Sequence, residues 1–127
     1  MLVRDDRIIS IQAPLSFELS LEQALDSCGE PAFVRASYDG ESPFHWYEFF
    51  YPSSGMLLIG RYERRISDIA DIVPQIRIIE VEYFPAGDLR WYLKNIRQLL
   101  SEDAIESYLN EFVTWPGINA TVPAYPY

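Results

Sequence analysis

Between Ser20 and Pro31 the apolar residues recur at the spacing of one helix face. The stripe consists of Leu21, Ala24, Leu25 and Cys28, at positions i, i+3, i+4 and i+7. Ser20 and Gln23 have the spacing of a capping box, and Gly29 and Pro31 are typical of a helix end. The pattern predicts a helix too short to be stable alone, whose stripe, Cys28 included, is buried on the strands that follow.

After this helix the pattern changes to that of β-strands. Both alternating sets of residues in Phe44–Tyr51 carry aromatic rings, as in a central strand that is covered on both faces. Pro52–Gly55 has the composition of a tight turn, and Met56–Glu63 can return antiparallel, so we expect a β-hairpin from 44 to 63. Further strands are expected at residues 32–38 and 75–84.

Beyond Asp88 the apolar residues return to helical spacing. Ser101 can cap a second helix, so residues 88–114 form either two helices or one that bends near Leu100. The remaining segments are an N-terminal arm or strand at 1–14, a loop that could hold one helical turn at 64–74, and an extended proline-containing tail at 118–127.

These elements predict one α+β domain over residues 1–127. We expect an antiparallel sheet of three to five strands, with the short N-terminal helix packed on it and the C-terminal helical pair on or beside it. No linker is long enough to divide the chain into separate domains.

Charge and composition exclude several classes of protein. Ten Lys and Arg against nineteen Asp and Glu give a net charge of -9, so nucleic acid and anionic membrane surfaces are repelled. No apolar run has transmembrane length, so direct insertion into a membrane is not expected. The first ten residues also lack the apolar core of a secretory signal, so we expect either a cytoplasmic protein or an extracytoplasmic one whose leader has been removed, the second being slightly favoured.

Candidate catalytic groups are few. The chain has one His and one Cys, and it lacks a Gly-rich phosphate loop and the Cys or His pairs of a zinc site, so no catalytic residue, metal or cofactor is expected. Carboxylates are the abundant chemical groups. Glu80 and Glu82 lie on one strand face, and Asp68 and Asp71 lie in one loop, so each pair could bind a cation, although solvated surface charges use the same residues.

Aromatic residues are the other unusual feature, with three Trp, nine Tyr and seven Phe. They form either a large aromatic core or a core with rings left over for a docking face, where Trp and Tyr supply much contact area with few rotatable bonds. The candidate interaction residues are Trp91, Trp115, Tyr47 and Tyr51.

The capped helix, the run Gly29-Glu30-Pro31 and the pair Trp46-Tyr47 resemble the BamE/SmpA-like small envelope lipoprotein domains. The pattern is also similar to the repeats of β-lactamase-inhibitor proteins, and it covers residues 19–63, or at most 19–84. The chain departs from it in lacking a lipid-attachment cysteine near the N-terminus, in having a single helix before the strands, and in the added helical region at 88–114. The resemblance implies a helix on an antiparallel sheet and a non-catalytic, protein-binding role in the bacterial envelope.

Together these observations predict a non-enzymatic protein-interaction or scaffold module that docks onto another protein through surface aromatics. The alternative is a small acidic cytoplasmic antagonist, such as an immunity or inhibitor protein, whose charge of -9 complements a basic target.

Overall fold

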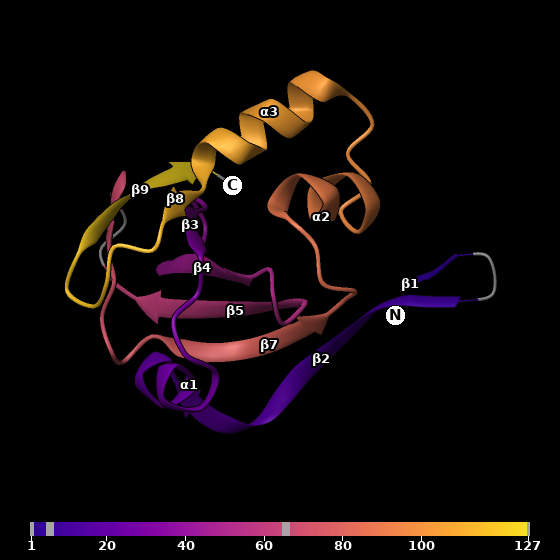
Figure 1. Cartoon of the computed structure of the whole chain (residues 1–127). Coiled ribbons are helices and arrows are strands. Elements are labelled where there is room, and N and C mark those ends of the chain that lie inside the picture. The colour runs from indigo at the N-terminus through magenta and orange to yellow at the C-terminus, as the bar shows by residue number, and fades with distance from the viewer. Residues whose placement is uncertain (1, 5–6, 65–66, 127) are drawn as a thin grey trace.

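A computed structural model describes residues 2–4, 7–64 and 67–126 (Figure 1). The elements are β1 (Leu2–Arg4), β2 (Arg7–Ser20), α1 (Leu21–Cys28), β3 (Phe33–Tyr38), β4 (Phe44–Tyr51), β5 (Met56–Glu63), β6 (Ile69–Asp71), β7 (Arg77–Tyr83), α2 (Leu89–Asn95), α3 (Glu102–Glu111), β8 (Val113–Thr114) and β9 (Thr121–Pro126). The strands form one curved sheet, with α1 below it and α2 and α3 above it in the view of Figure 1.

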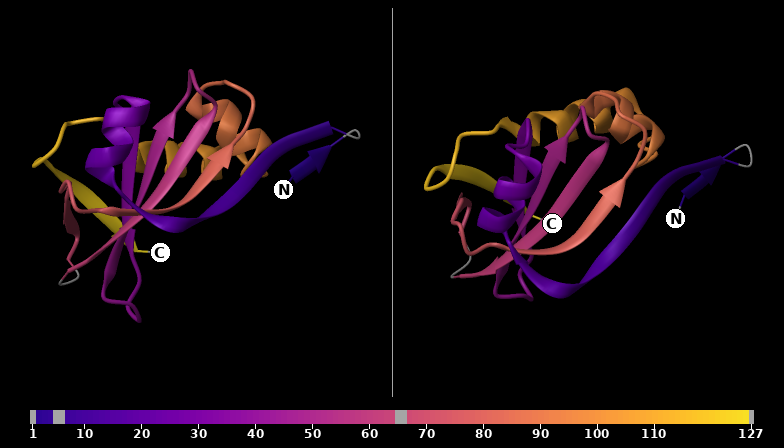
Figure 2. Two further views of the ribbon diagram at one scale, coloured as in Figure 1. Left: turned by 90° about the horizontal axis from the view of Figure 1, so that it is seen from below. Right: turned by 60° about the horizontal axis from the view of Figure 1, so that its bottom comes forward.

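The sheet has the strand order β1-β2-β7-β5-β4-β3-β9-β6, and β8 pairs with the start of β3 beside this path. Neighbouring strands are antiparallel except for β3 and β9, which are parallel. Figure 2 shows the long β2 along one edge of the sheet, with the β1–β2 hairpin extending beyond the body of the molecule. The sheet is therefore mixed, and its central strands come from the middle of the chain.

The predicted sheet of three to five antiparallel strands is wrong, because nine strands pair within the described residues and one pairing is parallel. The local sequence pattern was misleading for three of the strands. Pro14 suggested the end of a strand, but β2 lies at an edge, where a residue without an N–H is tolerated, and pairing with β7 resumes at Leu19 after an irregularity. The predicted loop at 64–74 contains β6, and the tail becomes β9 because the free edge of β3 gives it a partner.

The N-terminal helix has the predicted capping box. Ser20 Oγ accepts the backbone N–H of Gln23 at 3.2 Å, and Gln23 Oε1 accepts the N–H of Ser20 at 2.9 Å. Leu21 is buried on the sheet, but Cys28 is exposed, so its predicted burial is wrong. Cys28 is the last residue of an eight-residue helix, and the stripe leaves the sheet before it is reached.

The predicted hairpin is confirmed. β4 and β5 pair without a bulge from Phe44 with Glu63 to Tyr51 with Met56. Gly55 closes the turn with φ +61°, a left-handed conformation that a residue without a Cβ adopts freely.

The C-terminal helical region consists of two helices. Asp88 caps α2 by accepting the N–H of Trp91 at 2.7 Å, and Ser101 caps α3 by accepting the N–H of Ala104 at 3.1 Å. Between them Gln98 has φ +57°, which a continuous helix would not contain. Neither these helices nor α1 has the length and apolar character needed to cross a membrane, and this holds for all helices in the described ranges.

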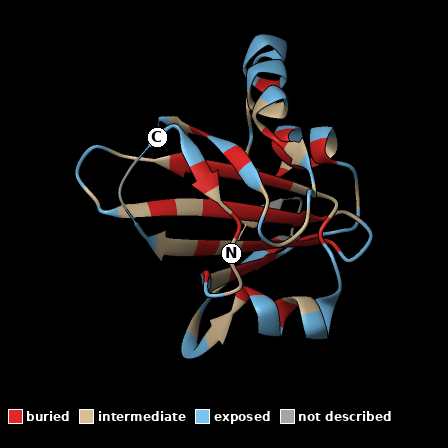
Figure 3. Ribbon diagram, turned by 90° about the vertical axis from the view of Figure 1, so that its left-hand side faces the viewer, coloured by how far each residue is buried: buried red, intermediate tan, exposed pale blue. Residues whose placement is uncertain are grey.

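The two faces of the sheet carry separate cores, and alternation along β4 assigns its side chains to them. Tyr47 and Phe49 belong to the core beneath α1, whereas Phe50 belongs to the core beneath α2 and α3. Figure 3 shows the buried residues concentrated in the central strands and on the inward sides of the helices. The second core does not include the charged residues of the same sheet face, and Arg35 and Glu48 form a polar region beside it.

Candidate functional site: a cavity on the polar part of the sheet

A cavity of about 650 Å³ lies between this polar region of the sheet and the segment that contains α2 and α3. It is lined by Arg35, Ser37, Asp39, Trp46, Tyr47, Glu48, Ile59, Ile79, Glu80, Arg97, Tyr108 and Pro126. Its volume lies within the range that is common for ligand pockets. The cavity is therefore a concave feature from which a binding role can be argued.

The register of the strands shows which residues form the floor of the cavity. Arg35, Glu48, Ile59 and Glu80 lie in one row across β3, β4, β5 and β7. Trp46 lies one row further along, opposite Ser37 on β3. Because alternate residues of a strand point to the same face, Trp46, Glu48 and Phe50 all face the helices. Arg97, after α2, and Tyr108, on α3, complete the wall.

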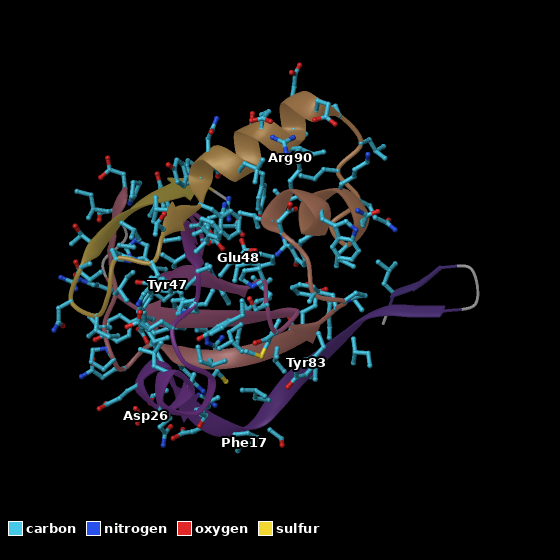
Figure 4. The ribbon with its side chains drawn as sticks, in the orientation of Figure 1. Phe17, Asp26, Tyr47, Glu48, Tyr83 and Arg90 are labelled. Atoms are coloured by element: carbon cyan, nitrogen blue, oxygen red, sulfur yellow. The ribbon has the colours of Figure 1, made fainter. Side chains whose placement is uncertain are left out.

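Glu48 is the centre of a buried ionic network, and Figure 4 shows it between the sheet and α3. Its Oε1 accepts hydrogen bonds from Arg35 Nη1 and from the Tyr108 hydroxyl, both at 3.0 Å. Its Oε2 accepts from Arg97 Nη2. The side chains of Arg35 and Glu48 are only 7% and 12% exposed, so water contributes little to their solvation.

The network extends from α3 to the edge of the sheet. Arg35 also donates from Nε and Nη2 to Glu111 Oε1, at 3.2 and 2.8 Å. Arg97 donates from Nε to the Tyr92 hydroxyl at 2.9 Å and from Nη1 to the Tyr108 hydroxyl at 3.0 Å. The Tyr92 hydroxyl in turn donates to Glu82, which also accepts from Gln12 on β2 at 3.0 Å. These links hold the helices at a defined position over the sheet.

Electrostatics keep both arginines charged. Burial alone would lower the pKa of Arg97, but the Glu48 carboxylate and the neighbouring tyrosine hydroxyls outweigh it and raise that pKa. The pKa of Arg35 is also raised, since Tyr108, Glu48 and Glu111 offset its burial. The cations thus act as fixed structural charges and do not exchange protons near neutral pH.

Four tyrosines should stay protonated at alkaline pH while the protein is folded. Burial is the main cause that raises the pKa of Tyr47, Tyr51, Tyr92 and Tyr108 above the ordinary tyrosine value. The folded-state pKa of these tyrosines exceeds their pKa in the unfolded chain. The stability that this difference provides is therefore fully present below about pH 10. It is lost as the pH rises towards the folded-state pKa, because the unfolded chain ionises first.

Ultraviolet absorbance of phenolate measures this directly. With secondary structure intact, the folded protein should ionise fewer of its nine tyrosines between about pH 10 and 11 than the urea-unfolded chain does. Titration of all nine in one transition near pH 10, without unfolding, would contradict the protonation that we assign.

The structure does not bring the four predicted interaction residues together. Tyr47 and Tyr51 are 0% and 4% exposed, and their hydroxyls donate to the backbone carbonyls of Asp71 and Gly29. They therefore offer almost no surface for docking. Trp91 and Trp115 are half-buried, and they pack against different cores on opposite faces of the sheet.

The two members of each predicted carboxylate pair have different surroundings. Glu82 is 3% exposed and bonded within the network, so its assignment to a solvated strand face is wrong, whereas Glu80 is half-buried at the cavity. Asp71 forms an ion pair with Arg64, and Asp68 is exposed. The described residues contain no group of three or more His, Cys, Asp or Glu that could hold a metal ion.

Sequence reasoning did not single out Arg35, Glu48, Arg97 or Tyr108. Arg35 and Glu48 are the lone charged residues of two mostly apolar or aromatic strands, and such a position signals a buried pair. Their pairing depends on the register of β3 with β4, which neither strand encodes by itself.

Exposed apolar side chains gather elsewhere, near the edge formed by β2 and β7. Ile11 and Tyr83 are paired across these strands and are 45% and 50% exposed, and Phe17 on β2 is 61% exposed. Figure 4 shows Phe17 and Tyr83 projecting outward beside β2. The exposed aromatics thus differ from the four predicted ones.

Comparison with known proteins adds no assignment. No protein-family model matches the chain, and searches among curated proteins and among solved structures find no match. The resemblance to BamE/SmpA-like domains therefore stays a prediction.

Proposed function

We propose that the chain is a non-enzymatic protein-interaction module that binds a partner by taking one of its side chains into the cavity. The observation that carries this proposal is the cavity of about 650 Å³ on the sheet, whose lining combines aromatic and aliphatic side chains with the hydrogen-bonded ionic network. A preorganised pocket with a few fixed polar groups suits recognition, because little freedom is lost on binding.

The state of the polar groups favours binding over catalysis. Both arginines of the network donate to Glu48, and they also donate to Glu111 or to tyrosines. The charges of Arg35, Glu48 and Arg97 are therefore already paired within the protein. Ser37 lines the cavity, but His45 is 1% exposed and its Nε2 lies 3.0 Å from the Ser67 carbonyl oxygen. Alternation along β4 puts His45 on the opposite face from Trp46, so it cannot activate Ser37.

Selection from a random peptide library displayed on phage tests the role without a known partner. We expect enriched peptides that bind the wild-type protein and lose binding to Ile59→Trp, because the larger ring fills the floor of the cavity. Ile69→Trp is the matched control, since Ile69 is 57% exposed on β6 and does not line the cavity. Thermal unfolding of each variant shows whether it is folded.

Enriched peptides that bind wild type and Ile59→Trp equally well would place recognition elsewhere, with the Ile11, Phe17 and Tyr83 surface as the next location to map. A library that yields no enriched peptide would contradict an interaction role for this chain.

A further inference from the structure

The three carboxylates of the cavity differ in their bonding. Glu48 accepts from two arginines and a tyrosine, as described above. Asp39 Oδ1 accepts the backbone N–H groups of Glu41 and Ser42, at 3.0 and 2.7 Å. Glu80 is half-buried as a residue, and its carboxylate makes no hydrogen bond or ion pair with any residue in the described ranges. Among the three carboxylates of the lining, Glu80 is therefore the one with neither oxygen bonded to a described residue.

Apolar groups surround this acceptor. Ile59 lies between Glu48 and Glu80 in the strand register, and two strand spacings, about 10 Å, separate the backbones of the two carboxylates. Ile79 lines the cavity beside Glu80, and Trp46 lies in the next row. A long apolar stem could lie along Ile59 and Trp46 with its polar end at Glu80.

The charge balance favours a cationic ligand. The lining holds three carboxylates and two guanidinium groups, and both guanidinium groups already donate to Glu48, to Glu111 or to tyrosines. Arg61 does not line the cavity, and its guanidinium carbon lies over the rings of Phe44 and Trp46, at 4.8 and 5.9 Å from their centroids. The unpaired Glu80 would repel an anion in the cavity, and the arginines of the lining already donate to other protein groups.

We infer that the side chain which enters the cavity is a lysine of the partner protein, with its ammonium group on Glu80 and its methylene stem on Ile59 and Trp46. This inference rests on the proposed interaction role. We infer lysine rather than arginine because its four-carbon stem can lie along Ile59 and Trp46 while its compact ammonium group reaches Glu80. A basic partner also agrees with the net charge of -9.

Titration of the isotopically labelled protein with capped tripeptides tests the inference by NMR. The probes are acetyl-Gly-X-Gly-amide with X as lysine, arginine, glutamine or glutamate. We expect the lysine peptide to shift the Trp46 indole N–H and the amides of Ile59 and Glu80, and to bind more tightly than the other three. Glu80→Gln should weaken the lysine peptide at least about tenfold, because it removes a charged acceptor.

Glu22→Gln is the matched control, since it makes the same charge change at an exposed position of α1, on the other face of the sheet, and should leave the affinity unchanged. Equal or tighter binding of the arginine, glutamine or glutamate peptide would overturn the inference, as would no shift by the lysine peptide up to about 10 mM. Phage-selected peptides that enter the cavity but tolerate Glu80→Gln would also overturn it, while leaving the interaction role in place.

Discussion

Replacing Glu48 with glutamine should lower the free energy of unfolding by about 3 kcal/mol, because it removes the counter-charge that the buried Arg35 and the partly buried Arg97 share. Glutamine keeps the volume of the side chain but brings two N–H donors towards guanidinium groups that are donors themselves. Urea unfolding followed by circular dichroism measures the change. The loss should appear as a lower midpoint with little change in slope, since the folded surface is nearly the same.

Glu106→Gln is the control for this substitution. It also removes a carboxylate bonded to an arginine, but the pair of Glu106 with Arg90 is exposed on the helices and screened by water. Its urea midpoint should match that of the wild type. If the two variants had equal midpoints, the ionic network would not hold the helices on the sheet as described.

Replacing Gly55 with alanine should destabilise the protein by about 2 kcal/mol or more. Gly55 has φ +61°, which costs energy for any residue with a Cβ, and an added Cβ would lie 2.0 Å from the Phe84 carbonyl oxygen. That oxygen belongs to backbone at the end of β7, so relief would require the β4–β5 turn to move away from it. Thermal or urea unfolding measures the effect.

Gly40→Ala provides the comparison within the same chain. Gly40 also lies in a loop between strands, but it lacks a positive φ, and a Cβ there would meet nothing within 4 Å. Its stability should be unchanged or rise by up to about 1 kcal/mol through the lower entropy of the unfolded chain. A similar loss of stability at both positions would mean that neither the positive φ of Gly55 nor its contact with the Phe84 carbonyl oxygen causes the effect.

The ionic network has a consequence beyond stability. Apolar residues of similar volume could replace a buried ion pair at little cost, and they would extend the second core over the rest of the sheet face. Because charged residues occupy the neighbouring positions instead, the buried part of that core ends at the row of Phe50 and Leu57. These charged residues are Arg35, Glu48 and Arg97. The cavity exists because this part of the face is polar, and departures from apolar packing of this kind concentrate at functional sites.

Much of the local structure follows from adjacent residues. The cap of α1 depends on Ser20 and Gln23, which are three residues apart, and the β4–β5 hairpin depends on one turn between two strongly patterned strands. Each is signalled by residues that are close in sequence, so a local pattern is sufficient to predict it. The burial of Cys28 was mispredicted because periodicity gives the direction of a side chain but not the extent of the surface beneath it.

The sequence by itself therefore determined the short capped helix, the aromatic hairpin and the helical character of residues 88–114, because residues close together in the chain signal each of them. Only the tertiary structure decided the number of strands, the parallel pairing of β9 with β3, and the cavity. Strand pairing is a contact between distant segments, and each edge accepts whichever segment the chain brings to it. The bond between Arg97 and Glu48 joins residues 49 positions apart, so their meeting depends on the packing of α2 and α3 on the sheet and has no local signature.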